Sequence, residues 1–269
     1  MNLKENLVTS NKQPTAAMIV IGNEVLSGRT KDKNIGWVAE QLEQNGIKLV
    51  EARIIRDDQE TIISTIKEIY KLVDYVFTSG GIGPTHDDIT TPAIAKAFEV
   101  SVERNKEALR RLQEHYKGTN IELNSARLKM ADIPNGATLI DNPVSAAPGF
   151  NIQNVYVMAG VPKIMQAMLD GILKNIKFGK KTFSISIACE IGEGNLAKDI
   201  GEIEETESDL EIGCYPWFKS GIIGTNIVVR SINEDMCKRA AEKVKKLIKD
   251  FGKTYTCLLY TSDAADDRI

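Results

Sequence analysis

A glycine-rich loop is the segment of this 269-residue chain in which residue types and spacing point most directly to chemistry. It runs from Ser79 to Asp88 (SGGIGPTHDD) and follows an apolar run, 75–78, that we predict to be a strand. Gly80, Gly81 and Gly83 carry no side chains, so their backbone N–H groups can converge on an anion. The loop is neither a P-loop nor a G-x-G-x-x-G turn. It predicts a phosphate site of another kind; a tight turn is the simpler alternative.

Two carboxylates accompany this loop, and they would repel a phosphate unless a cation lay between them. Asp88 ends the loop, and Asp57 follows the run 47–55, which we predict to be the second strand. A Mg²⁺ ion, or another divalent cation, bridges carboxylate and phosphate oxygens in such sites. Asp57 and Asp88 are therefore the candidate metal ligands and catalytic residues. N-capping of the next helix is an alternative role for Asp57.

Three further loops leave predicted strands toward the same rim. The loop 22–28 (GNEVLSG) carries Glu24, and the loops 142–149 (NPVSAAPG) and 159–163 (AGVPK) contain proline, which makes them rigid. The last of these enters a helix N-terminus, which is itself an anion site, and Lys163 adds positive charge there. Glu24 and Lys163 are thus candidate ligand-binding residues, although a solvated surface position is the simpler role for Lys163.

The elements that must position these loops are strands and helices in alternation. Apolar runs at 16–21, 47–55, 75–78 and 155–159 predict strands, and helical spacing begins at Asn34, near 59, at Thr91-Pro92 and at Pro162. Such alternation predicts parallel pairing through right-handed crossovers. In open sheets of this type ligands bind beyond the carboxyl ends of the strands. The stretch 133–150, with three prolines, is expected to be rich in loops.

The chain divides into four parts by pattern. A polar lead-in, 1–15, precedes an α/β domain over 16–178, and a small α+β module follows over 179–254. Residues 221–224 (GIIG) have the letters of a nucleic-acid-clamping G-x-x-G loop. The module is not basic, however, and the interior of that motif is apolar, so we expect a strand-entry turn and no nucleic acid. The last part, 255–269, continues no earlier pattern, and we interpret it as a non-native tail outside the fold.

The composition excludes several classes of protein. The chain has 34 Lys plus Arg, 37 Asp plus Glu and a net charge of −3, which argues against nucleic-acid binding by bulk charge. No apolar run approaches the roughly 20 residues that a membrane span needs. The four cysteines form no C-x-x-C pair and only two histidines exist, so a zinc framework is excluded. Without a secretory signal, a cytoplasmic location is expected.

These segments together resemble the MoaB/Mog family, the molybdopterin-binding-like fold, in the form found in CinA-type competence/damage-inducible proteins. The resemblance spans about 18–176 and rests on three motifs: GGIGPTHDDIT at 80–90, IIRDD at 54–58 and NPVSAAPGF at 142–150. It implies a three-layer α/β sandwich with a mostly parallel sheet, assembled as a homo-oligomer, either a dimer or a trimer. It also implies that Asp57 and Asp88 are metal or catalytic carboxylates. The ligand contacts it implies are Gly80, Gly81, Gly83, Ser145 and Gly149.

The chain also departs from the longer members of that family. The family pattern has Gly-Thr in place of Ser145-Ala146 and Pro in place of Ala159. The second module is similar to the KH-like domain of CinA proteins, and the C-terminal deamidase domain is missing, as in a short form that is also similar to the N-terminal region of eukaryotic FAD synthases. Deamidation is therefore not expected.

Three functions remain in competition, each with a small phosphate-containing nucleotide or pterin as ligand. The first is a Mg²⁺-dependent pyrophosphatase that cleaves a dinucleotide such as ADP-ribose or FAD. The second is a molybdopterin-binding protein that transfers AMP in molybdenum cofactor biosynthesis, with molybdopterin as its ligand. The third is a non-enzymatic nucleotide- or pterin-binding protein that uses only the pocket.

Overall fold

The computed structural model describes residues 13–260, which form two compact units divided between Gly179 and Lys180. Residues 1–12 of the expected lead-in and 261–269 of the expected tail lie outside the described residues. In the part of the chain that the structure describes, no helix is long and apolar enough to cross a membrane.

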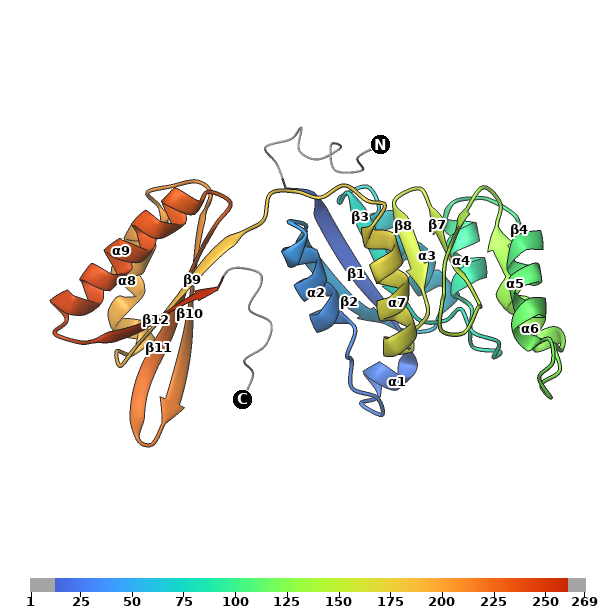
Figure 1. Cartoon of the computed structure of the whole chain (residues 1–269), viewed down its shortest axis with the longest axis horizontal. Coiled ribbons are helices and arrows are strands. Elements are labelled where there is room, and N and C mark those ends of the chain that lie inside the picture. Colours follow the sequence, from blue (N-terminus) through green and yellow to red (C-terminus); the bar gives the residue numbers. More distant parts are fainter. Residues whose placement is uncertain (1–12, 261–269) are drawn as a thin grey trace. The chain divides into compact units, whose positions relative to one another are not determined.

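A six-stranded sheet forms the centre of the first unit (Figure 1). Strands β1, β2, β3 and β8 run parallel, whereas β7 is antiparallel to both of its neighbours, β8 and β6. The sheet is therefore mostly parallel, as expected. Its order is β2 (Lys48–Ile55), β1 (Thr15–Ile21), β3 (Tyr75–Ser79), β8 (Val155–Met158), β7 (Gly149–Ile152) and β6 (Thr138–Ile140).

Helices cover both faces of this sheet and confirm the three-layer sandwich. Helices α2 (Ile35–Gln44) and α7 (Pro162–Leu173) pack on one face around Met18, Phe77 and Met165. Helices α3 (Gln59–Ile69), α4 (Thr90–Ala97) and α5 (Lys106–Tyr116) pack on the other face around Ile19, Val76 and Phe150. Alternate residues of β1 and β3 thus face opposite cores, as the two-residue period of a strand requires.

Short elements fill the rest of the first unit. A one-turn helix, α1 (Asn23–Leu26), follows β1, and β4 (Val102–Arg104) pairs with β5 (Asp132–Pro134) in a separate two-stranded sheet. Helix α6 (Ser125–Leu128) continues into a 3₁₀ turn (Lys129–Ala131). The stretch 133–150 is less irregular than expected, because β5 ends in it, β6 lies in it and β7 begins in it.

All the loops predicted to carry chemistry leave the same edge of the sheet. The four parallel strands end there, and antiparallel pairing of Ile140 with Gly149 and of β7 with β8 brings the loop 141–148 to that edge as well. The order β2-β1-β3 makes the point between β1 and β3 a topological switch, where ligands bind in open sheets. Figure 1 shows α1 at this edge.

The second unit is a four-stranded antiparallel sheet with two helices, which confirms the α+β expectation. Its order is β10 (Leu210–Lys219), β11 (Ile222–Ser231), β9 (Phe183–Cys189) and β12 (Tyr255–Tyr260). Helices α8 (Glu193–Glu204) and α9 (Glu234–Asp250) contribute Leu196, Val244 and Ile248 to one core with the sheet.

A long hairpin joins β10 to β11 through a two-residue turn. Lys219 is opposite Ile222, and Ser220 and Gly221 between them both have positive φ, 53° and 82°. The G-x-x-G letters at 221–224 thus belong to a hairpin turn and the start of a strand, as expected. Strand β10 is an edge strand: its Ile212 N–H donates to the Glu204 carboxylate, and Pro216 has no N–H.

The first residues of the predicted tail belong to the fold, and this corrects their exclusion. Strand β12 pairs with β9 from Tyr255 opposite Cys189 to Tyr260 opposite Ser184. Tyr255 and Cys257 also pack against the core of the second unit. Pattern reasoning missed this strand because a single edge strand of six residues gives little periodic signal. The interpretation of the tail as non-native stays a prediction.

Candidate functional site

The main chain of the glycine loop packs directly against the main chain at the ends of β1 and β8. Gly80 has φ +114°, and a Cβ there would collide with the carbonyl oxygen of Ile21 at the end of β1. A Cβ at Gly160, beyond β8, would lie 3.2 Å from Gly80 Cα. A Cβ at Gly81, φ +68°, would collide with the hydroxyl of buried Thr90. Glycine is therefore required here for close approach as well as for turn geometry.

Asp57 connects the loop after β2 to the start of α1 and does not cap α3, the helix that follows it. Its Oδ2 accepts a hydrogen bond of 2.7 Å from the backbone N–H of Asn23, just after β1. The neighbouring Asp58 caps α3 instead, accepting from the Thr61 N–H at 2.9 Å. The Thr61 hydroxyl and N–H hold the pKa of Asp58 below its usual value. The capping alternative for Asp57 is thus excluded, and among the described residues its Oδ1 accepts no hydrogen bond.

Asp88 folds back over the glycine loop. Its Oδ2 accepts from the backbone N–H of Thr85 at 2.7 Å, and a Cβ at Gly83 would lie 2.7 Å from the same oxygen. Gly83 therefore gives the carboxylate room to approach the main chain. As with Asp57, the Oδ1 atom accepts no hydrogen bond from the described residues. The predicted pair thus keeps one oxygen each for a ligand or a cation.

Glu24 lies at the same edge, in α1. Its side chain is exposed, and its carboxylate folds against Gly22, where a Cβ would lie 2.7 Å from Oε1. Within the described residues this carboxylate accepts no hydrogen bond from the protein. Glu24 is therefore free to orient a water molecule or a ligand hydroxyl.

The proline loop holds Ser145 in a defined position through Asn142, which is 7% exposed. Asn142 Oδ1 accepts from the Ser145 N–H at 3.1 Å, and its Nδ2 donates to Ser145 Oγ at 2.8 Å. Because Ser145 Oγ accepts this bond, its own O–H remains available to donate to a ligand. A second Nδ2 bond, 2.8 Å to the Ala147 carbonyl, closes the loop.

Two other predicted site residues occupy less direct positions. Gly149 is buried, and a Cβ there would collide with the Val157 carbonyl oxygen and lie 2.6 Å from Met168 Cε. Its lack of a side chain thus serves close packing, and the expected ligand contact stays a prediction. Lys163 is exposed in the first turn of α7, with no ion pair to the described residues.

Asn34 has a role that pattern reasoning missed. Asn34 occupies the N-cap position of α2, where its side chain makes no capping bond, because the carboxylate of Asp32 accepts the N–H groups of Asn34 and Ile35. The Asn34 side chain instead donates from Nδ2 to Ser79 Oγ at 2.7 Å and to the Gly160 carbonyl at 3.0 Å. It is 5% exposed, and its Oδ1 has no partner in the described residues. Asn34 therefore joins the ends of β3 and β8.

Lys129 is a second residue that pattern reasoning missed. It comes from the 3₁₀ turn and donates from Nζ to the carbonyl oxygens of Thr85 at 2.9 Å and Asp88 at 2.6 Å. A cation is thereby fixed at the acidic end of the glycine loop. The pKa of Asp87 in this loop is lowered, chiefly by the Thr85 hydroxyl and to a smaller extent by the charge of Lys129.

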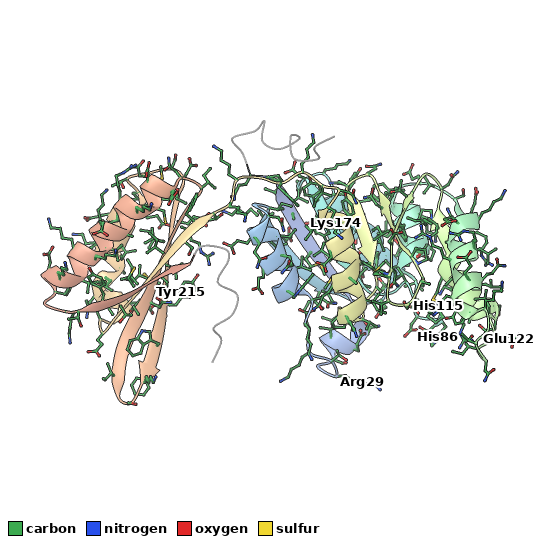
Figure 2. All side chains as sticks on the ribbon, viewed as in Figure 1. Arg29, His86, His115, Glu122, Lys174 and Tyr215 are labelled. Atoms are coloured by element: carbon green, nitrogen blue, oxygen red, sulfur yellow. The ribbon has the colours of Figure 1, made fainter. Side chains whose placement is uncertain are left out.

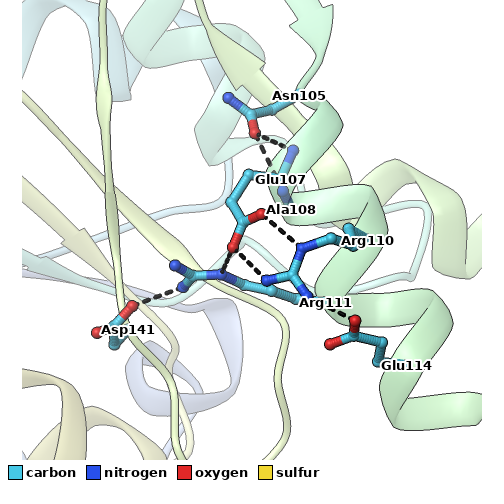
Figure 3. Close-up of polar contacts among 7 residues, drawn as sticks. All are labelled: Asn105, Glu107, Ala108, Arg110, Arg111, Glu114 and Asp141. Atoms are coloured by element: carbon cyan, nitrogen blue, oxygen red, sulfur yellow. Dashed lines mark hydrogen bonds and ion pairs between the residues drawn. The ribbon is translucent and has the colours of Figure 1, made fainter.

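An ion-pair network on α5 connects this helix to the proline loop (Figure 3). Glu107 accepts two bonds of 2.7 Å from Arg110 and one of 2.9 Å from Arg111, and these guanidinium groups lower its pKa to about 2. Arg111 also donates to Asp141 at 2.6 Å, one residue before Asn142. The network thus attaches the start of the loop that carries Ser145 to helix α5.

Both polar and apolar side chains project from this edge, where Leu26, Val144 and Val161 are exposed. Figure 2 shows Arg29 and His86 at the end of the first unit where the parallel strands finish, whereas Lys174 marks the opposite end of α7. His86 is exposed in the glycine loop.

A divalent metal fits these residues only together with a ligand. Within residues 13–260 no group of three or more His, Cys, Asp or Glu side chains is arranged to hold a metal ion. Mg²⁺, however, is commonly bound by one or two carboxylates together with substrate phosphates and water. The free Oδ1 atoms of Asp57 and Asp88 are suitable hard donors of that kind.

The sandwich, its glycine loop at the switch point and the carboxylates beside it define a domain of the MoaB/Mog type. Residues 17–177 match the model of the MoCF_biosynth family, described as a probable molybdopterin binding domain, and the chain belongs to this family. Residues 181–254 match the middle domain of FAD synthase, which identifies the second unit.

The chain is similar to several known proteins over much of its length. A protein of Metallosphaera sedula is 40% identical over 259 residues, covering 89% of this chain and 96% of the relative. A CinA-like protein of Kosmotoga olearia is 28% identical over 87% of this chain, which spans 58% of that longer protein. The crystal structure of the protein CinA from Thermoplasma acidophilum is 34% identical, with a TM-score of 0.57, covering 62% of this chain and 99% of that one. The chain is thus a CinA-related MoaB/Mog-domain protein.

Proposed function

We propose that the protein is a Mg²⁺-dependent pyrophosphatase that cleaves a dinucleotide such as ADP-ribose or FAD. The observation that supports this proposal is that Asp57 and the glycine loop with Asp88 lie at the same edge of the sheet, each carboxylate with one oxygen that accepts no hydrogen bond from the described residues. A second unit of the FAD synthase middle-domain type supports a flavin or adenine dinucleotide as the substrate class.

Each residue of the site has a chemical task in this reaction. Backbone N–H groups of Gly81 and Gly83 and the O–H of Ser145 bind the diphosphate, whereas the Gly80 N–H already donates to the Met158 carbonyl at 3.1 Å. The carboxylates of Asp57 and Asp88 hold the cation, which when bound polarises the phosphoryl oxygen. Glu24 orients the attacking water. Water adds across the P–O–P bond, so that ADP-ribose gives AMP and ribose 5-phosphate, and FAD gives AMP and FMN.

Product analysis tests the proposal. The purified full chain is incubated with ADP-ribose or FAD and MgCl₂, and AMP is quantified by chromatography. We expect AMP release that EDTA abolishes and that Asp88→Asn reduces by about 100-fold or more, the usual effect of removing a group that stabilises transition-state charge. Asp87→Asn, at the exposed neighbouring position, is the matched control and retains activity within about threefold. Absence of AMP with Mg²⁺, Mn²⁺, Co²⁺ and Zn²⁺ would overturn the proposal.

Molybdopterin binding is the second candidate, because the matched family is described as a probable molybdopterin binding domain. On that alternative the same N–H groups bind the pterin phosphate, and the chain transfers AMP to it. Tight molybdopterin binding without hydrolysis of either dinucleotide would favour it. Ligand binding that Asp88→Asn weakens, without turnover of any substrate, would favour a non-enzymatic binding protein. Assembly as a dimer or trimer stays a prediction.

A further inference from the structure

Lys129 supplies a fixed positive charge at the acidic loop. Its ammonium donates to the carbonyl oxygens of Thr85 and Asp88, which lie 44 and 41 residues away in the sequence. These two bonds bracket the turn that contains Asp87 and Asp88. The side chain is half-buried, so the ammonium is held by the fold and does not sample many positions.

The hydrogen-bonding capacity of Lys129 is only partly used. A lysine ammonium has three N–H donors, and here the described residues accept from two of them. Both acceptors are backbone carbonyl oxygens, so the ammonium makes no direct ion pair with the carboxylate of Asp87 or Asp88. A spare donor and a positive charge outside any direct ion pair, beside a glycine loop, are what an anionic ligand requires.

We propose that Lys129 is a phosphate-binding residue of this site. Its third N–H donates to a ligand phosphate, and its positive charge partly offsets the negative charges of Asp87 and Asp88 when no metal is bound. This proposal rests on the proposed function for the location of the phosphate, but it makes a separate claim. Phosphate binding needs no metal, whereas hydrolysis does.

Titration calorimetry in EDTA tests the proposal on the full chain. Wild-type protein, Lys129→Gln, Lys129→Arg and the control Lys174→Gln are each titrated with ADP-ribose, pyrophosphate and adenosine. Lys174 is exposed at the opposite end of α7 (Figure 2), so its replacement makes the same charge change away from the site. Thermal melts show whether each variant is folded.

We expect Lys129→Gln to weaken binding of ADP-ribose and pyrophosphate about tenfold or more, as for loss of a charge-assisted hydrogen bond. Lys129→Arg retains most of the affinity, and Lys174→Gln and adenosine binding change by less than about twofold. The salt dependence of ADP-ribose binding also becomes shallower in Lys129→Gln, because one cationic contact is lost.

Two results would overturn the proposal. Unchanged affinity for ADP-ribose and pyrophosphate in a folded Lys129→Gln variant would show that the ammonium serves the loop alone. An equal loss for adenosine would show a structural effect. Failure of the hydrolysis assay with metal-free binding intact would remove the proposed reaction but not this proposal. Wild-type protein that binds neither ADP-ribose nor pyrophosphate would remove both.

Discussion

Asp57 and Asp58 are adjacent in the sequence but have different roles, and substitutions at the two positions can distinguish these roles. Asp57 faces the loop after β1 through Asn23, whereas Asp58 caps α3 through Thr61. We expect Asp57→Asn to reduce pyrophosphatase activity about 100-fold with little change in Tm. Asp58→Asn should lower Tm by a few degrees and leave kcat/KM within about threefold. Equal losses of activity in the two variants would contradict the assignment. Activity assays and thermal melts check both.

Residue types and spacing located the glycine loop and its carboxylates, but not their partners. Asn34 and Lys129 were hidden for the same reason: each acts on residues more than 40 positions away in the sequence. An asparagine before a helical pattern is typical of a cap, and a lysine is typical of a surface. Only the crossing of loops at the sheet edge shows that these two side chains serve the site.

At the scale of elements, long periodic segments were predictable and short ones were not. Strands β1, β2, β3 and β8 and helices α2, α3 and α7 follow the expected pattern closely. Strands β4 to β7 have three or four residues each, too few to show alternation. Strand β7 also reverses direction, which no local pattern indicates, because tertiary pairing alone decides it.

The α5 network makes a prediction about acid stability. The pKa of Glu107 falls from 4.5 to about 2 on folding, first through Arg110 and then through Arg111. A lowered pKa means that the ionised form is favoured in the folded state, so this stabilisation is complete above about pH 4.5 and is lost as pH falls toward 2. The free energies of unfolding of wild type and Glu107→Gln, measured with urea, should therefore differ at pH 6 and converge near pH 2.

Glu60→Gln is the matched control, because Glu60 is exposed and makes no hydrogen bond through its side chain to the described residues. The difference between Glu60→Gln and wild type should be small at both pH values. If the free energy of unfolding of Glu107→Gln still differed from that of wild type at pH 2, the assigned role of the ion pairs would be contradicted.

At the scale of the whole molecule, the chain consists of two units with separate cores. Strand β12 tests where the second unit ends. Removing residues 255–269 leaves β9 as an unpaired edge and exposes the core beside Tyr255 and Cys257. We expect this truncation to destabilise the second unit by about 1–3 kcal/mol, the scale of one buried large side chain.

Urea unfolding followed by the fluorescence of Trp217, which lies in the second unit, measures this change. Removing only residues 261–269 is the control and should leave the transition unchanged. A chain ending at residue 254 with wild-type stability would show that β12 adds nothing to the fold. Dinucleotide hydrolysis should be retained in both truncations, because the proposed site lies within the first unit.

The open side of β10 has a consequence for how the protein behaves at high concentration. A ten-residue edge strand with exposed Phe218 next to its last residue is ordinarily a template for fibrous self-association. Pro216 cannot donate to an incoming strand, and the Ile212 amide is already satisfied by Glu204. The ladder that a fibre needs is therefore interrupted at two of its rungs. The edge of β10 is thus a poor template for the strand-by-strand growth of a fibre.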